Sequence, residues 1–91
     1  MIKLLLEDVD RSNAVRFNSS LKDLVKIGSK FLSSNGVGED YEVVDIYSGG
    51  RGSQFLTLKI IKDSNDAKYS SIGRKLYSVP VSSLYRMMFI E

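Results

Sequence analysis

The side chains best suited to chemistry in this chain are the lysines, arginines and tyrosines of its second half. Lysine and arginine can hold the oxygen atoms of a phosphate or a carboxylate. An exposed tyrosine can stack on a nucleobase, a contact worth about 1–3 kcal/mol, or anchor a protein interface. The candidate contact residues are Arg51, Lys59, Lys68, Arg74, Lys75, Arg86, Tyr47 and Tyr69. This set predicts that the protein binds a partner.

The residues that most enzymes depend on are missing. The chain has no histidine and no cysteine, so it lacks the side chain that titrates near neutrality and the thiol nucleophile. Ser-His-Asp and Cys-His arrangements are therefore impossible. No pair of carboxylates or activated lysine stands out either. We expect a non-enzymatic protein that carries no cofactor and no metal.

Two loops contain fragments of ligand-binding motifs. Gly49–Gly52 is rich in glycine, but it lacks the Gly-Lys-Ser/Thr ending and the following helix of a phosphate loop. We interpret it as a hairpin tip that needs positive φ, with Arg51 kept as a contact candidate. Asp63–Asp66 begins like a calcium loop, but Ala67 and Lys68 stand where an oxygen ligand and a glycine are needed. This second stretch is predicted to be a solvated turn.

Length and composition indicate one globular domain. The chain has 91 residues, of which 43% are hydrophobic and 26% charged. Residues 1–60 are balanced in charge, so the net charge of +2 arises in residues 61–91. No segment approaches the roughly 20 apolar residues of a membrane helix, and Met1–Leu6 is shorter than the apolar region of a signal peptide. We expect a cytoplasmic protein without membrane contact.

The chain alternates between apolar, β-prone segments and turn signals, which predicts strands. The main strands are expected at Tyr41–Tyr47, Gln54–Lys62, Lys75–Val81 and Tyr85–Ile90, with shorter ones at Ile2–Leu6 and Lys30–Leu32. A short helix is expected at Leu21–Val25, after a serine cap and before Gly28. Pro80 should end its strand or lie on a sheet edge, and Ser82–Leu84 should form one helical turn.

Side-chain alternation predicts which residues face the core. The clearest stripe is Leu56, Leu58 and Ile60, opposite a second face made of Phe55, Thr57, Lys59 and Ile61. In Tyr41–Tyr47, Val44 and Ile46 are expected on one face and Tyr41, Val43 and Tyr47 on the other. In the next strand Tyr77, Val79 and Val81 should lie together. The aromatic residues expected in the core are Phe31, Phe55, Phe89 and Tyr77.

This order of elements resembles an SH3-like small β-barrel of the KOW/Tudor type. The likeness covers residues 27–91: an entry strand at Ile27–Phe31, two long strands, a longer loop, Lys75–Val81, a single turn at Val81–Leu84 and a closing strand. It implies a mainly β fold, a small antiparallel barrel of about five strands, whose loops and exposed aromatic residues contact nucleic acid or protein. Residues 1–26 would then be an N-terminal extension with a strand and the short helix, within a single domain of residues 1–91.

Three functions remain open from the sequence. The leading hypothesis is a binding module that contacts DNA or RNA through one basic, tyrosine-bearing face, with lysine and arginine on phosphates and weak sequence specificity. The second is a regulatory accessory or inhibitor factor that binds a protein, similar in general style to short phage-encoded proteins that dock on a host enzyme. The third is a structural subunit whose strand edges pair in an oligomer.

Overall fold

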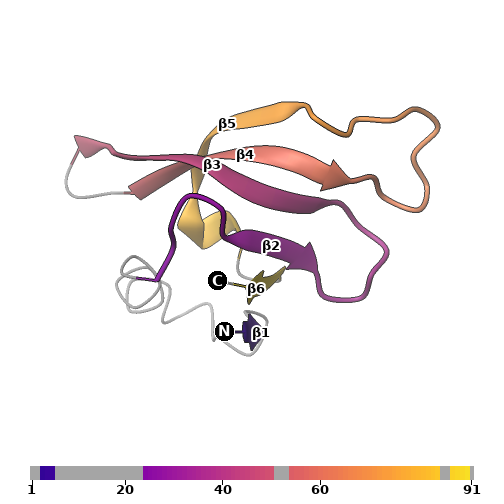
Figure 1. Ribbon diagram of the computed structural model, residues 1–91, viewed down its shortest axis with the longest axis horizontal. Coiled ribbons are helices and arrows are strands. Elements are labelled where there is room, and N and C mark those ends of the chain that lie inside the picture. The colour runs from indigo at the N-terminus through magenta and orange to yellow at the C-terminus, as the bar shows by residue number, and fades with distance from the viewer. Residues whose placement is uncertain (1–2, 6–23, 51–53, 85–86, 91) are drawn as a thin grey trace.

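The protein is a small, mainly β structure, seen in a computed structural model that describes residues 3–5, 24–50, 54–84 and 87–90 (Figure 1). The strands are β1 (Lys3–Leu5), β2 (Lys30–Ser33), β3 (Asp40–Ser48), β4 (Gln54–Lys62), β5 (Lys75–Pro80) and β6 (Met87–Ile90), and a 3-10 turn, η4 (Val81–Leu84), precedes β6. These bounds confirm the strands and the single turn that the sequence predicts. The helix expected at Leu21–Val25 falls mostly outside the described residues.

All six strands form one antiparallel sheet in the order β1-β6-β2-β3-β4-β5. Figure 1 shows β3, β4 and β5 as one layer, with β2, β6 and β1 turned under it and η4 in the space between. This arrangement is compatible with an SH3-like fold. No ladder among the described residues joins the edge strands β1 and β5, so the predicted closed barrel is not formed there. β5 ends at Pro80, which has no N–H to extend a ladder.

The N-terminal strand belongs to the same sheet. β1 pairs with β6 over three positions, from Lys3 opposite Ile90 to Leu5 opposite Met88. The start of the chain therefore extends the sheet at the edge opposite β5. No helix in the described part of the chain is long and apolar enough to cross a membrane.

The core lies between the two layers and is closed by η4. Phe31, Val43, Leu56, Leu58 and Phe89 are fully buried, and the rings of Phe31 and Phe89 pack with centroids 5.4 Å apart. Val81 and Leu84 from η4, together with Val25, complete this cluster. The predicted stripe of Leu56, Leu58 and Ile60 is confirmed as the inner face of β4.

A β-bulge in β3 makes the predicted alternation of that strand wrong. Val43 pairs with Leu58 and Asp45 pairs with Thr57, so Val44 is an extra residue between the two pairs. An extra residue shifts the period of two by one position. Val43 and Ile46 therefore both contribute to the core, and Tyr41, expected on the other face from Ile46, packs against the core as well.

A second bulge, in β5, reverses the prediction for Tyr77. Leu58 pairs with Leu76 and Leu56 pairs with Val79, so both Tyr77 and Ser78 lie opposite Thr57. Ser78 has a φ of 55°, the left-handed conformation typical of an irregular strand position. Tyr77 is consequently 71% exposed instead of buried with Val79. Val79, partly buried, still packs against the core, as does Val81 at the start of η4, whereas Tyr77 is turned to solvent.

Candidate binding face

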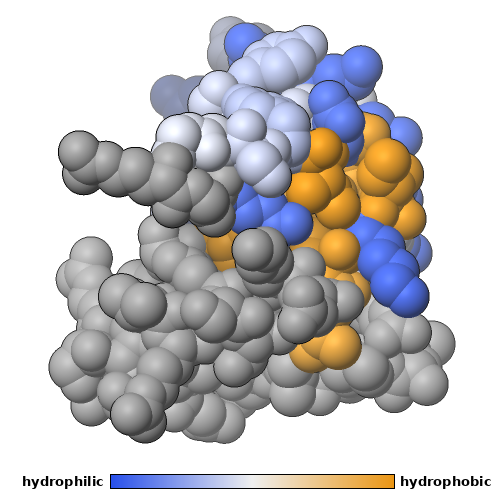
Figure 2. All heavy atoms as spheres, turned by 90° about the vertical axis from the view of Figure 1, so that its left-hand side faces the viewer, coloured by the Kyte–Doolittle hydropathy of each residue, from blue (hydrophilic) through white to orange (hydrophobic). Residues whose placement is uncertain are grey.

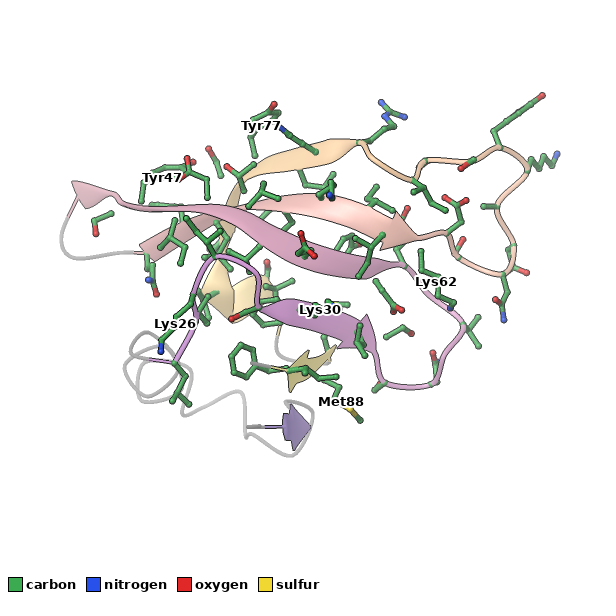
Figure 3. The ribbon with its side chains drawn as sticks, in the orientation of Figure 1. Lys26, Lys30, Tyr47, Lys62, Tyr77 and Met88 are labelled. Atoms are coloured by element: carbon green, nitrogen blue, oxygen red, sulfur yellow. The ribbon has the colours of Figure 1, made fainter. Side chains whose placement is uncertain are left out.

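The side of β3, β4 and β5 that faces away from the core carries several of the predicted contact residues. We call this side the outer face; its cross-strand rows are Glu42, Lys59 and Lys75, then Asp45 and Thr57, then Tyr47, Phe55 and Pro80. Residues paired directly across strands lie on the same face, so the register alone brings these side chains together. Figure 3 shows Tyr47 and Tyr77 both on the side away from η4.

The charged row runs across four strands and ends on two cations. Lys30 in β2 pairs with Glu42 in β3, Glu42 pairs with Lys59 in β4, and Lys59 pairs with Lys75 in β5. The Lys59 ammonium lies 3.9 Å from the Glu42 carboxylate. Lys75 is exposed and makes no ion pair within the described residues. The outer face is therefore mixed in charge at its centre, and its positive excess lies at the β5 edge.

The aromatic row is packed more tightly than a free stacking platform would be. The rings of Tyr47 and Phe55 stack with centroids 5.8 Å apart. The Tyr47 hydroxyl shares a hydrogen bond with the Ser78 hydroxyl, which reaches across β4 from β3 to β5. Thr57 lies on the strand that this bond crosses and is only 6% exposed. Tyr47 is therefore held in place, with 38% of its surface left for a partner.

Phe55 lies on the outer face and is outside the core cluster in which the sequence placed it. Gly49 covers its ring: a Cβ atom on Gly49 would lie 2.3 Å from Cε2 of Phe55. Neither Gly49 nor Gly50 has a positive φ, so the predicted reason for these glycines is wrong. Gly49 is required for a close approach to an aromatic ring. Figure 2 faces this end of β3 and β4, where hydrophobic residues reach the surface beside hydrophilic ones.

The second group of contact candidates lies in a stretch that we call the basic segment, Lys68–Tyr77, in which every residue except Ser71 is exposed. Its cations are Lys68, Arg74 and Lys75, and it contains no acidic residue. Tyr69 is 86% exposed, and Ile72 and Tyr77 are also well exposed. Cations and exposed aromatic or aliphatic side chains therefore occur together in this segment, which contains no carboxylate side chain.

Hydrogen bonds at its base hold the basic segment in shape. Asp63 accepts a bond from the Ser71 amide at 2.6 Å, and the amide of Gly73 donates to the carbonyl of Ile60 at 2.8 Å. Gly73 has a φ of 92°, a conformation that glycine adopts without strain. Asp63 is half-buried and acts here as a loop acceptor, so the predicted solvated turn is confirmed for Asn65 and Asp66, which are exposed, and not for Asp63. The side chains beyond this base are free to meet a partner.

Two further polar contacts are structural. Lys62 donates from Nζ to the Gly36 carbonyl at 2.8 Å, which fixes the loop between β2 and β3 (Figure 3). The Tyr41 hydroxyl donates to Glu39 at 3.0 Å. Burial, that hydrogen bond and the nearby carboxylates of Glu39 and Asp40 raise the pKa of Tyr41 to about 12. In the described part of the chain no three metal-binding side chains come together.

The predicted contact residues thus fall into two adjoining groups. Lys68, Tyr69, Arg74 and Lys75 lie in the basic segment; Tyr47 and Lys59 lie on the outer face; and Arg51 and Arg86 are outside the described residues. Ile72, Leu76 and Tyr77 were missed as exposed residues. Ile72 could have been noticed as an isolated apolar residue in a polar loop. The exposure of Tyr77 could not have been predicted, because the alternation of apolar residues in the sequence does not reveal the bulge that exposes it.

Comparison with known proteins adds no assignment: no family model, curated protein or solved structure matches this chain. Inference about function therefore depends on the geometry described above.

Proposed function

We propose that the protein is a non-enzymatic binding module that contacts single-stranded DNA or RNA through the basic segment. The observation that carries this proposal is the joint exposure of three cations and two tyrosines, Tyr69 and Tyr77, in ten consecutive residues without an acid. Cations that follow a phosphate backbone, interleaved with aromatic rings that stack on bases, are the usual means of binding single strands. Lys68, Arg74 and Lys75 would contact phosphates, and Tyr69 would stack on a base.

Single strands suit this surface better than duplexes. The described residues contain no helix that could enter a major groove and read base edges. Unstacked bases can instead reach Tyr69, which has 86% of its surface free. Tyr47 and Lys59 would have a secondary role, since Tyr47 is held by Phe55 and Ser78, and Lys59 lies beside Glu42. Sequence specificity is expected to be weak.

An SH3-like fold of the KOW/Tudor type, with the sheet left open between β1 and β5 in the described residues, is the finer fold that we propose. The order β6-β2-β3-β4-β5, with the last strand beside the first strand of the meander, and the 3-10 turn before β6 support it. Barrels of this type contact either nucleic acid or protein, so the fold does not choose the partner.

The test is a titration of the full chain into labelled single-stranded DNA, duplex DNA and RNA. Binding should be micromolar or tighter at about 50 mM salt and fall steeply at about 200 mM, because phosphate contacts release counterions. Arg74→Glu should weaken binding at least about tenfold. Lys26→Glu, which reverses another exposed lysine, in the segment before β2, should leave it unchanged. Failure of all three nucleic acids to bind would refute the proposal.

The second candidate is a regulatory accessory factor that docks on another protein, for example in the manner of a phage-encoded inhibitor. It is favoured by one observation: four large apolar side chains of the basic segment are exposed, namely Tyr69, Ile72, Leu76 and Tyr77. Aromatic and aliphatic anchors of this kind dominate protein interfaces. Affinity for such a partner should depend much less on salt than affinity for nucleic acid.

A further inference from the structure

β5 is an edge strand with one free side. Among the described residues its one ladder is with β4, from Lys75 opposite Lys59 to Pro80 opposite Phe55. Nothing in the described part of the chain pairs with its other side. An edge strand presents a row of N–H and C=O groups that can pair with another strand. This surface is made of backbone and does not depend on the proposed binding of nucleic acid.

The charged row of the outer face ends at this edge with two adjacent lysines. From β2 to β5 the row reads Lys30, Glu42, Lys59 and Lys75, so the sign alternates until its last two members. Like charges directly across a ladder are unfavourable, and opposite charges are favourable. An acidic side chain on a strand added beyond β5 would lie next to Lys75 and give it the opposite charge that it lacks within the row. The edge is therefore complementary to a negatively charged strand.

Apolar side chains flank this edge on both faces of the sheet. Leu76 shares the inner face with Leu58 and is 37% exposed, whereas the fully buried Leu58 has a strand on each side. Tyr77, on the outer face, is 71% exposed. A strand laid beside β5 would cover Leu76 with one set of its side chains and contact Lys75 and Tyr77 with the alternate set. It should carry apolar residues on the first set and acidic residues on the second.

Pairing with a second copy of this chain is disfavoured by charge. Each copy would bring Lys75, with Arg74 directly before it, to the shared edge, and the basic segment has no acidic residue to neutralise them. Lysine on an edge strand is a common protection against such self-association. The bulge at Tyr77 and Ser78, and Pro80 after it, confine regular pairing to the first half of β5.

We propose that the free edge of β5 accepts an extended acidic segment of a partner protein as an added strand, along Lys75–Tyr77. The added strand would alternate acidic residues, beside Lys75 on the outer face, with apolar residues beside Leu76 on the inner face. Main-chain hydrogen bonds would supply most of the affinity, and the charge of Lys75 would select the partner.

The test uses the full chain labelled with nitrogen-15 and a blocked eight-residue peptide of alternating glutamate and valine. Addition of the peptide to about 1 mM, enough to detect a weak complex, should shift the amide signals of Lys75–Val79 and slow their hydrogen exchange. Amides of β1 and β3 should not change. Absence of any shift at this concentration, or shifts confined to residues 68–73, would overturn the proposal.

Two control peptides separate strand addition from attraction of charge. A peptide with N-methyl groups on alternate residues keeps its charge but cannot complete the ladder, so it should lose binding. A lysine–valine peptide keeps the ladder but reverses the charge, and it should bind at least about tenfold more weakly. Equal binding of the N-methylated peptide would show that only side chains are contacted and would overturn the added strand.

The matched variants are Lys75→Glu and Lys26→Glu, each a reversal of one exposed lysine. Lys75→Glu should reverse the preference and favour the lysine–valine peptide, whereas Lys26→Glu should behave like the unaltered protein. If Lys75→Glu keeps the preference for the acidic peptide, the assigned row is wrong. An oligonucleotide titration on the same samples reports the proposed function separately, because its shifts should span Lys68–Tyr77 and therefore include residues 68–73, which precede the strand.

Discussion

β4 and β5 are neighbours in one sheet, yet they have opposite relations to solvent. β4 has strands on both sides and supplies Leu56, Leu58 and Ile60 to the core. In the part of the chain that the structure describes, β5 has a strand on one side only, and most of its residues are exposed. Both carry apolar residues, so hydrophobicity does not separate them. Position in the sheet distinguishes the two strands. The central strand β4 stabilises the fold, and the edge strand β5, with the loop before it, is available for contact.

The largest effect should come from truncating the buried partner of a cross-strand pair. Leu58 and Leu76 are directly opposite, but Leu58 is fully buried and Leu76 is 37% exposed. Leu58→Ala should lower the free energy of unfolding by about 2–5 kcal/mol, because it leaves a cavity. Leu76→Ala should cost much less, about 0.5 kcal/mol as for surface changes. Urea denaturation of both variants measures the difference, and equal costs would contradict the contrast between the strands.

A second large effect is expected at Gly49, where the outer face is tightly packed. A methyl group there would overlap the Phe55 ring at 2.3 Å, so Gly49→Ala should cost about 1–3 kcal/mol. Gly50 has no atom within 4 Å of the equivalent position, and Gly50→Ala is the control, with little or no loss. Thermal unfolding of the two variants compares them. Addition of Phe55→Leu to Gly49→Ala should recover part of the loss.

The strand boundaries could be predicted because the chain marks them locally. Gln54–Lys62 was predicted with its exact bounds, and its inner face follows from simple alternation of Leu56, Leu58 and Ile60. The faces of β3 and β5 could not be predicted, since each contains a bulge. A bulge places two residues of one strand opposite one residue of the neighbouring strand. It is therefore a property of the pair of strands and cannot be found in the sequence of either strand alone.

The part of the candidate site that depends on local sequence could also be predicted. Lys68, Tyr69, Arg74 and Lys75 are close in sequence, so their grouping in the basic segment needed no knowledge of the fold. The contact of Lys59 with Glu42 and the cross-strand bond between Tyr47 and Ser78 depend on register. These long-range contacts limit the freedom of the Lys59 and Tyr47 side chains, which are two of the predicted contact residues. Closure of the barrel is a property of the whole sheet and was not settled by strand order along the chain.

A smaller effect, dependent on pH, is expected from Tyr41 on the inner side of β3. The pKa of Tyr41 is about 12 in the folded protein, against an ordinary value of 10.0. Between these values the unfolded state binds fewer protons, so stability should be unaffected below pH 10 and fall as the pH rises towards 12. The free energy of unfolding of the Tyr41→Phe variant should fall less steeply over this range. Denaturation at pH 9 and pH 11.5 measures the slopes, and identical slopes would contradict the assigned environment.

The smallest predicted effect concerns the like-charged pair at the edge. Lys75→Glu places a carboxylate beside Lys59, so it should raise the free energy of unfolding by about 0.2–1 kcal/mol. Lys26→Glu has no such cross-strand partner among the strands and should change stability by less. The comparison is made by urea denaturation at low salt, and added salt should reduce the gain. A loss of stability in Lys75→Glu would show that the two lysines are not neighbours.

The central claim, that β5 and the loop before it form the contact region while β4 maintains the fold, has one direct test. Amide signals of the nitrogen-15-labelled chain are followed as a single-stranded oligonucleotide is added at about 50 and 200 mM salt. The claim predicts shifts centred on Lys68–Tyr77 that largely disappear at the higher salt. Shifts centred on β1, β2 or β6 with the basic segment unchanged, or no shifts at either salt concentration, would contradict it.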